Sequence, residues 1–336
     1  MKTTKLSLAK QTTNTDKDTF SLEDENTASL KDGYIRIKVS LISIEPAMSG
    51  WIVNRTNYMP KLAIGDTMHA FAIGEVIESR HVEFKAGDRV NGNLGCQTIA
   101  DINPNVTQLD KSIPEYISDE LALSACGLTG LTAYFGLEKI GKLKSTDIVV
   151  ISAAAGAVGS MAGQFAKMQG CKVIGIVGSD EKMALIQNEF GYDMALNYKD
   201  PDFKQQFKDA TPEGIDVYYD NVGGPILNYS LARINKNARV IICGGIAHYN
   251  SNSPMTGPSH YFNLVHQRAL MQGFIVLDYE QEFNQAREKI ASYIEQGKLS
   301  YRTEIFEGLA KVPDALQHMF KGKNKGKVLV KLSYSY

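Results

Sequence analysis

The stretch SAAAGAVGS (Ser152–Ser160) decides the fold of this chain. An apolar run, DIVVIS (147–152), leads into it, and small and apolar residues at helical spacing follow it. Compared with the dinucleotide-binding pattern G-x-G-x-x-G, the stretch keeps Gly156 and Gly159 but has Ala154 at the first glycine. Alanine is tolerated there if its φ stays negative, because a Cβ is penalised mainly at positive φ. This succession of strand, loop and helix predicts a dinucleotide-binding loop, and the alternative is a tight turn whose small residues serve packing.

Strands and helices alternate on the C-terminal side of this loop. The apolar runs that are typical of strands, with helical stretches between most of them, are CKVIGIV (171–177), MALNY (194–198), IDVYYD (215–220), ARVIIC (238–243) and LMQGFIV (270–276). Such alternation predicts the α/β class, with a doubly wound parallel Rossmann sheet over residues 126–299.

β-rich sequence flanks this region on both sides. Before residue 125, runs such as YIRIKVSLISI (34–44) alternate apolar and polar residues between turn glycines, which predicts a mostly antiparallel β domain over 1–125. After residue 300 the strand character returns in YRTEIFEG and GKVLVKL. We therefore expect the tail 300–336 to complete the first domain, so that the nucleotide-binding domain is an insert.

The composition is that of an ordinary globular protein. The 336 residues are 43% hydrophobic and carry a net charge of −1, which gives no electrostatic reason to expect nucleic acid or a membrane surface as a partner. The chain has neither an apolar run of roughly eighteen residues nor an apolar signal segment. The four cysteines are far apart. These features predict a cytoplasmic protein with reduced thiols.

The residues after the second strand indicate the type of cofactor. An NAD site usually has a carboxylate at this strand end for the ribose 2′-hydroxyl, but this chain has Gly178 and Ser179 there. Lys182 follows one helical turn later, and Tyr198 ends the next strand. This pattern favours NADP(H). The acidic residues 180–181 count against it unless they serve as helix-capping residues, and Lys182 could also be an ordinary solvated lysine.

These motifs carry a family resemblance that covers nearly the whole chain. It rests on the glycine loop and on GLTGLTAYFGL (127–137), NYK (197–199), YDNVGG (219–224), CGGIAHYN (243–250) and GKNKGK (322–327). Together they resemble the zinc-independent branch of the medium-chain dehydrogenase/reductase superfamily, most closely the alkenal/one oxidoreductases. The resemblance implies a GroES-like β domain plus a Rossmann domain, NADP(H) as cofactor, and a small-molecule enone or enal as substrate. Zinc is not expected, because SIEPAMSG (43–50), the first ligand region of zinc relatives, contains no cysteine.

The resemblance also implies a set of cofactor-binding residues. Those expected at the pyrophosphate, the adjoining ribose or phosphates, and the 2′-phosphate are Gly156, Ala157, Val158, Thr129, Ser179, Lys182 and Tyr198. Those expected around the nicotinamide end, or reaching the cofactor from the tail, are Asn221, Cys243, Tyr249, Phe274, Val276 and Asn324. The rest of the lysine run 321–327 is expected to be a solvated turn.

Three positions depart from the family pattern, and all are expected near the substrate cleft or the domain interface. Ser49 stands where arginine is usual, His69 is unexpected in its motif, and His266 stands where tyrosine is common. These changes concern the substrate and leave the cofactor assignment unaffected. The candidates for substrate contacts are Trp51, Tyr58, Met68 and His266. For the first three, a place in the β-domain core is an equally good interpretation.

Without a metal, an enone reductase must stabilise the developing enolate with hydrogen bonds. Tyr249 is the candidate donor, since its loop follows a strand at the carboxyl edge of the predicted sheet. Two alternatives remain open: an NADPH-dependent quinone reductase and a non-catalytic NADPH-binding protein. The apolar run 270–276 comes late in the sheet, and an exposed edge there predicts a homodimer.

Overall fold

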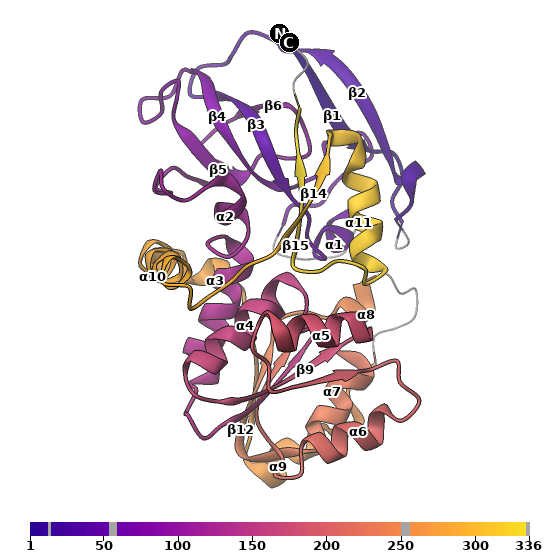
Figure 1. The fold of residues 1–336 in the computed structure, drawn as a ribbon. Helices are drawn as coiled ribbons and strands as arrows, with labels where there is room; N and C mark the ends of the chain where they lie inside the picture. Colours follow the sequence, from indigo (N-terminus) through magenta and orange to yellow (C-terminus); the bar gives the residue numbers. More distant parts are fainter. Residues whose placement is uncertain (13–14, 54–58, 250–255, 334–336) are drawn as a thin grey trace.

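The computed structural model describes residues 1–12, 15–53, 59–249 and 256–333. Figure 1 shows a β-rich part that contains the first and the last described strands, and below it a part in which helices surround a second sheet. None of the helices in the described ranges has the length and apolar character needed to cross a membrane.

The second part contains the expected parallel sheet. Six strands are arranged in the order β10-β9-β8-β11-β12-β13. Their bounds along the chain are β8 (Ile148–Ser152), β9 (Lys172–Val177), β10 (Met194–Asn197), β11 (Ile215–Asp220), β12 (Ile234–Ile242) and β13 (Leu270–Gly273). All neighbours are parallel, which confirms the α/β doubly wound fold class.

Alternate side chains of β8 show that helices cover both faces of this sheet. Val149 and Ile151 belong to a core cluster shared with α3 (Leu128–Phe135), α4 (Ala157–Met168) and α10 (Phe283–Glu295). Ile148 and Val150 belong to another cluster. That cluster includes residues of α6 (Phe203–Ala210) and α7 (Gly224–Leu231). Because successive side chains of a strand point to opposite faces, the two clusters lie on the two sides of the sheet.

The remaining helices and turns of this part connect the strands. They are α5 (Asp180–Asn188), α8 (Ile246–Tyr249), α9 (Asn263–Gln267), the π-helical turn η2 (Gly136–Gly141) and the 3-10 turns η3 (Ser259–Phe262) and η4 (Val276–Glu282).

The β-rich part is built from two sheets. A seven-stranded sheet has the order β14-β15-β3-β4-β5-β7, with β6 also paired to β3, and β1 pairs with β2 separately. The strands are β1 (Lys2–Leu8), β2 (Phe20–Asn26), β3 (Ile35–Ser43), β4 (Phe71–Ser79), β5 (Arg89–Asn93), β6 (Ile99–Ile102), β7 (Leu109–Asp110), β14 (Thr303–Glu307) and β15 (Lys327–Lys331). The helices and turns are α1 (Met48–Ile52), α2 (Asp119–Leu123), α11 (Val312–Phe320), η1 (Lys17–Thr19) and η5 (Leu309–Lys311). Strand β15 pairs antiparallel with β3, so the tail returns to the N-terminal sheet as expected.

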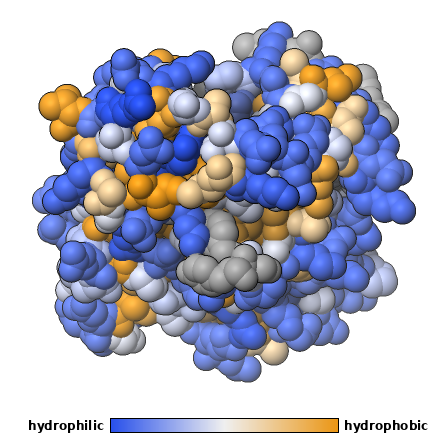
Figure 2. All heavy atoms as spheres, turned by 90° about the horizontal axis from the view of Figure 1, so that it is seen from above, coloured by the Kyte–Doolittle hydropathy of each residue, from blue (hydrophilic) through white to orange (hydrophobic). Residues whose placement is uncertain are grey.

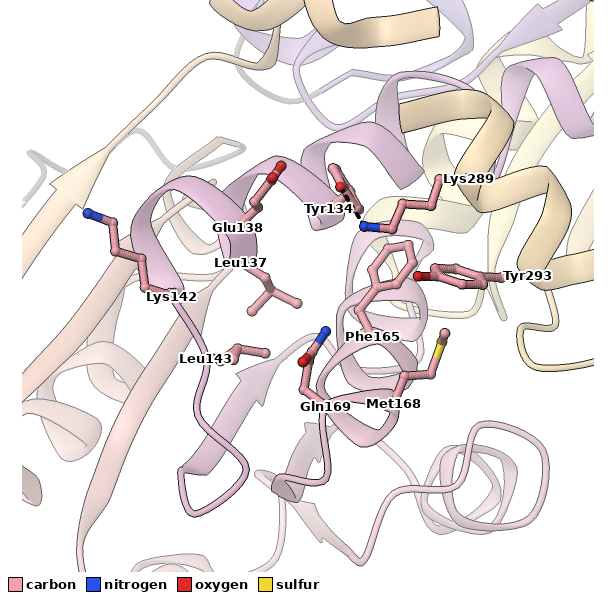
Figure 3. A pocket seen from close by; sticks show the side chains of 10 residues that line it. All are labelled: Tyr134, Leu137, Glu138, Lys142, Leu143, Phe165, Met168, Gln169, Lys289 and Tyr293. Carbon is pink, nitrogen blue, oxygen red and sulfur yellow. Dashed lines mark hydrogen bonds between the residues drawn. The ribbon is translucent and has the colours of Figure 1, made fainter. Parts of the chain in front are cut away.

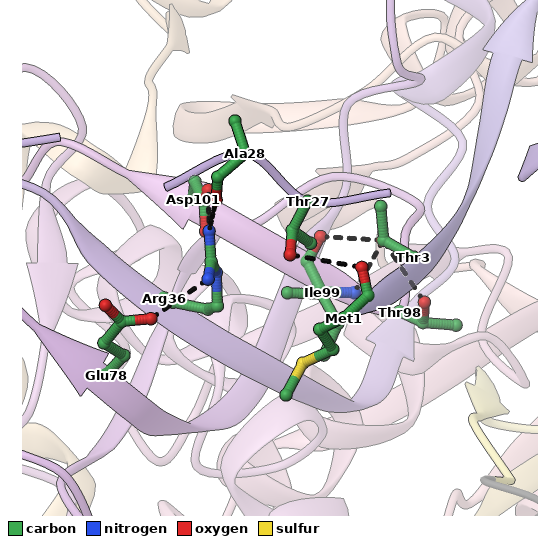
Figure 4. Close-up of polar contacts among 9 residues, drawn as sticks. All are labelled: Met1, Thr3, Thr27, Ala28, Arg36, Glu78, Thr98, Ile99 and Asp101. Atoms are coloured by element: carbon green, nitrogen blue, oxygen red, sulfur yellow. Dashed lines mark hydrogen bonds and ion pairs between the residues drawn. The ribbon is translucent and has the colours of Figure 1, made fainter. Parts of the chain in front are cut away.

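A buried arginine ties three strands of this sheet together. Arg36 on β3 lies opposite both Asp101 on β6 and Glu78 on β4. It forms two hydrogen bonds with Asp101, at 2.7 and 2.8 Å, and one with Glu78 at 3.0 Å (Figure 4). Removing either carboxylate would leave part of a buried charge uncompensated, so the network favours this strand register.

Candidate cofactor and active site

The glycine loop joins β8 directly to α4. Gly156 is the residue before the helix, and its φ of −81° is ordinary. The left-handed residue is Ala153, with a φ of 50°, whereas Ala154 keeps a negative φ as expected. A Cβ atom on Gly159 would lie 2.4 Å from the Ala153 carbonyl oxygen, so only glycine permits this approach. The first N–H groups of α4 are thereby presented at the loop, where a helix can bind a phosphate.

The returning tail closes against this loop. The Gly326 N–H donates to the Ala155 carbonyl oxygen at 2.8 Å, and the Asn324 side-chain amide donates to the Gly326 carbonyl oxygen at 3.1 Å. Gly326 has a φ of +87°, and a Cβ atom there would lie 2.2 Å from the Arg302 carbonyl oxygen. The tail therefore brings Asn324 close to the glycine loop, and its predicted contact with the cofactor stays a prediction.

The predicted 2′-phosphate residues come together at the ends of β9 and β10. The Ser179 hydroxyl caps α5 by accepting the Lys182 N–H at 3.3 Å. Tyr198 is exposed, and its ring lies 3.0 Å from the point where a Cβ atom on Gly178 would stand. Because Gly178 has no side chain, the Tyr198 ring can pack against it while remaining exposed to solvent.

Lys182 is a buried cation whose ammonium group donates to the Gly322 carbonyl oxygen at 2.9 Å. Burial lowers the pKa of Lys182, and no carboxylate within the described ranges forms an ion pair with it. The two acidic neighbours have other partners: Asp180 accepts from Asn197 at 3.0 Å, and Glu181 contacts Lys325. Glu304 and Glu181 stabilise the Lys182 charge only from a distance, and a buried charge without a direct ion pair is costly. The residues present therefore fit an anion such as the 2′-phosphate of NADP(H).

A buried carboxylate holds the loop after β11 in place. Asp220 accepts hydrogen bonds from the Val222 and Gly223 N–H groups and from the Ser152 and Tyr218 hydroxyls, all at 2.8–3.1 Å. Burial raises the pKa of Asp220, and these donors lower it again. The next residue, Asn221, is tied to β8 through its side-chain amide, which donates to the Ser152 carbonyl oxygen at 2.8 Å. The amide position predicted to lie near the nicotinamide is thus well defined.

The loop after β12 contains Cys243 and Tyr249. Burial raises the pKa of the Cys243 thiol to about 12, so it is a neutral thiol near pH 7. The Tyr249 hydroxyl oxygen accepts the Gly245 N–H at 3.1 Å, and burial raises the pKa of Tyr249. A Cβ atom on Gly244 would lie 3.5 Å from that hydroxyl oxygen and 3.3 Å from the Asn221 carbonyl oxygen. The hydroxyl therefore retains its proton and lies next to the Asn221 loop.

Phe274 and Val276 follow β13 at the same edge of the sheet. The Phe274 ring lies 3.0 Å from the point where a Cβ atom on Gly136 would stand. Val276 begins η4 and packs against the large core cluster. Thr129 lies in the first turn of α3, and its hydroxyl donates to the Ser124 carbonyl oxygen at 3.1 Å. Their contacts with a cofactor remain predictions.

Comparison with known proteins identifies the family. A family model described as zinc-binding dehydrogenase matches residues 157–292, and one described as N-terminal domain of oxidoreductase matches residues 5–109. Prostaglandin reductase 1 of Sus scrofa is 38% identical, with 93% of each chain covered. The NADPH-dependent curcumin reductase of Escherichia coli is 33% identical, with 94% of this chain and 92% of that protein covered. The crystal structure of CurA from Vibrio vulnificus superposes with a TM-score of 0.92 at 32% identity, with 99% of this chain and 100% of that chain covered.

The chain belongs to the alkenal/one oxidoreductase branch of the medium-chain dehydrogenase/reductase superfamily. A second structure of CurA is in complex with NADPH, and it superposes with a TM-score of 0.91. Within the described ranges of this reductase, no three His, Cys, Asp or Glu residues form a group suited to hold a metal ion.

The structure does not gather the predicted substrate residues of the reductase at one site, as it does the predicted 2′-phosphate residues. Trp51 and Met68 are buried in the core of the β-rich part, which favours the core interpretation for both. His69 packs edge-to-face on Trp51 with ring centroids 6.3 Å apart, and burial lowers the pKa of His69. Ser49 is also buried. Tyr58 lies outside the described residues.

The predicted substrate contact of His266 needs a correction. It is exposed on α9, which precedes β13 and therefore lies toward the amino end of that strand. Because the strands are parallel, the glycine loop and Tyr249 lie at the opposite, carboxyl edge. The structure does not bring His266 to the candidate substrate site.

One hollow on the described surface of the reductase lies near the other end of α4. A pocket of about 420 Å³ opens between η2, the C-terminal end of α4, and α10 (Figure 3). Its lining includes Leu137, Met168 and Tyr293. Since α4 begins at the glycine loop, the end that lines the pocket is remote from the predicted pyrophosphate-binding residues. This pocket is therefore not part of the candidate site.

Sequence reasoning missed two charged residues beside the candidate site. Asp220 carries a detectable signal, because a carboxylate that is the last residue of a buried strand is unusual unless it is hydrogen-bonded. Lys325 carries no such signal in the sequence, because its contact with Glu181 joins residues that are far apart in the chain.

Proposed function

We propose that this reductase uses NADPH to reduce the activated carbon–carbon double bond of α,β-unsaturated ketones and aldehydes. The observation that carries the proposal is the Tyr249 hydroxyl, which is protonated, partly buried and positioned at the carboxyl edge of the sheet beside the Asn221 loop. Lys182, Ser179 and Tyr198 would hold the 2′-phosphate, and the glycine loop would hold the pyrophosphate. Relatives named for prostaglandin, curcumin and 2-alkenal reduction support the substrate class.

The bound cofactor would supply a hydride equivalent to the β-carbon of the substrate. The role of Tyr249 is to donate a hydrogen bond to the substrate carbonyl oxygen while that oxygen gains enolate character. Its own oxygen already accepts the Gly245 N–H, which polarises the hydroxyl and strengthens it as a donor. The α-carbon then takes up a proton, so that the product is the saturated ketone or aldehyde.

Steady-state turnover with a substrate panel tests this proposal. We expect NADPH oxidation with enals and enones to be faster than with quinones. Faster turnover of quinones would identify a quinone reductase, and NADPH binding without turnover of any compound would identify a non-catalytic binding protein.

The variant Tyr249→Phe tests the donor itself. It should lower kcat for a small enone by about one to three orders of magnitude and leave the Kd for NADPH unchanged, since one oxyanion donor contributes about that much. Tyr261→Phe, an exposed tyrosine on η3, is the matched control. A primary isotope effect with deuterated NADPH must show that hydride transfer limits turnover. With that condition met, an unchanged kcat removes Tyr249 from the mechanism.

A further inference from the structure

The loop after α11 (residues 321–326) lies against the amino-terminal end of α5. The Lys182 ammonium donates to the Gly322 carbonyl oxygen at 2.9 Å, and the Lys325 ammonium contacts the Glu181 carboxylate. The Lys325 N–H donates to the Glu304 carboxylate at 2.7 Å, which ties the loop to β14. One lysine from α5 and one from the tail therefore meet beside the end of β9.

A third lysine joins them from the end of β10. The Cε of Lys199 lies 3.5 Å from the point where a Cβ atom on Gly178 would stand. Burial lowers the pKa of Lys182 and the positive charges of Lys199 and Lys325 lower it further, whereas the negative charges of Glu304 and Glu181 raise it. Lys199 and Lys325 thus place two further positive charges near the Lys182 ammonium group, which makes this surface suitable for an anion with more than one negative charge.

On the basis of the proposed function, we infer that Lys325 is a further specificity residue for the adenosine 2′-phosphate, and that Glu181 occupies its ammonium group until the phosphate arrives. The Glu181 side chain is 72% exposed and that of Lys325 is 25% exposed. Exposed carboxylate–lysine pairs contribute little to stability. A phosphate monoester carries nearly two negative charges and three acceptor oxygens, so it competes well for the same ammonium group.

The opposite arrangement, in which Glu181 stays in place and orients Lys325 toward the phosphate, predicts an effect of the opposite sign. If Glu181 competes with the phosphate, neutralising it strengthens binding of ligands that carry the 2′-phosphate. If Glu181 orients Lys325, neutralising it weakens their binding. A purely structural role of the pair changes the affinity for all adenine nucleotides equally.

Calorimetric titration of the full chain separates these cases. The probes are NADPH and NADH, and a second pair, adenosine 2′,5′-bisphosphate and 5′-AMP, which differ only in the 2′-phosphate. We expect Glu181→Gln to tighten binding of the two 2′-phosphate ligands up to about fivefold. Lys325→Met should weaken their binding about tenfold. NADH and 5′-AMP should bind equally well to all variants. In Lys325→Met, the further change Glu181→Gln should have no effect.

Lys323→Met, an exposed lysine of the same loop, is the control and should behave as wild type. Weaker binding of 2′-phosphate ligands by Glu181→Gln, or equal losses for NADPH and NADH in Lys325→Met, would overturn the inference. Wild-type protein that binds neither NADPH nor the bisphosphate would overturn the proposed function as well. Intact wild-type binding with an unaffected Lys325→Met would overturn this inference alone.

Discussion

Lys182 combines a buried side chain with a place beside the carboxyl end of β9; the place follows from local sequence, whereas the ammonium group contacts the distant Gly322. Ser179, Lys182 and Tyr198 were predictable as a group because each directly follows a strand or lies one helical turn later, and parallel strands end at one edge. The lysine run 321–327 was expected to be a solvated turn, and this was wrong for two of its members. Lys325 contacts Glu181, and the buried Lys327 donates to the Ile44 carbonyl oxygen at 3.1 Å. Contacts between residues so distant in the chain leave no local pattern.

The cofactor preference can be tested at Lys182. Lys182→Met keeps the apolar stem of the side chain, which packs in the interior, but removes the charge. The Kd for NADPH should rise about 10- to 100-fold, because charged hydrogen bonds contribute roughly 1.5–3 kcal/mol, while the Kd for NADH stays the same. Fluorescence titration measures both constants, with Lys208→Met on α6 as control. Equal affinity of the wild type for NADPH and NADH would contradict the cofactor assignment.

Among the elements, the strand–loop–helix unit β8–α4 follows its sequence pattern closely, whereas β13 is shorter than its apolar run. The run 270–276 predicted a strand, but β13 ends at Gly273, whose partner Ile242 is the last residue of β12. Without a neighbour to pair with, the chain turns at Phe274 into η4. The length of a strand depends on how far the neighbouring strand extends, and the apolar run 270–276 holds no information about that neighbour.

The glycine loop permits a stability test with two adjacent alanines. Ala153 has a φ of 50°, whereas Ala154 has a negative φ. Ala153→Gly should raise the free energy of unfolding by up to about 1 kcal/mol, since the left-handed conformation costs an L-residue roughly that much. Ala154→Gly should lower it by about 1–2 kcal/mol, through backbone entropy and through loss of a methyl group that is fully buried in the core. Urea denaturation measures both. An equal loss in the two variants would show that the loop does not strain Ala153.

At the scale of the whole molecule, the order of strands along the chain is a reliable guide to architecture, because β-rich segments flank a region of alternating strands and helices. The pairing of β15 with β3 follows that logic. The boundaries 125/126 and 299/300 remain our proposal. The expected edge position of residues 270–276 is confirmed for β13, which lies at the end of the six-stranded sheet. Seen from the β-rich end, apolar residues form separate patches among hydrophilic ones (Figure 2).

The edge at β13 predicts a homodimer. Leu270 and Met271 are 46% and 37% exposed, and β12 is the strand that pairs with β13 in the described chain. Exposed apolar edges tend to associate, and pairing two of them about a two-fold axis would join both sheets into one. Light scattering at micromolar concentration should give a mass near twice 37.0 kDa. The double variant Leu270→Lys, Met271→Lys should give a folded monomer, because lysine at an edge blocks pairing. Val82→Lys, at a 98% exposed position in the β-rich part, should remain dimeric. A monomeric wild type would refute the homodimer, and a dimer that persists in the double variant would place the interface elsewhere.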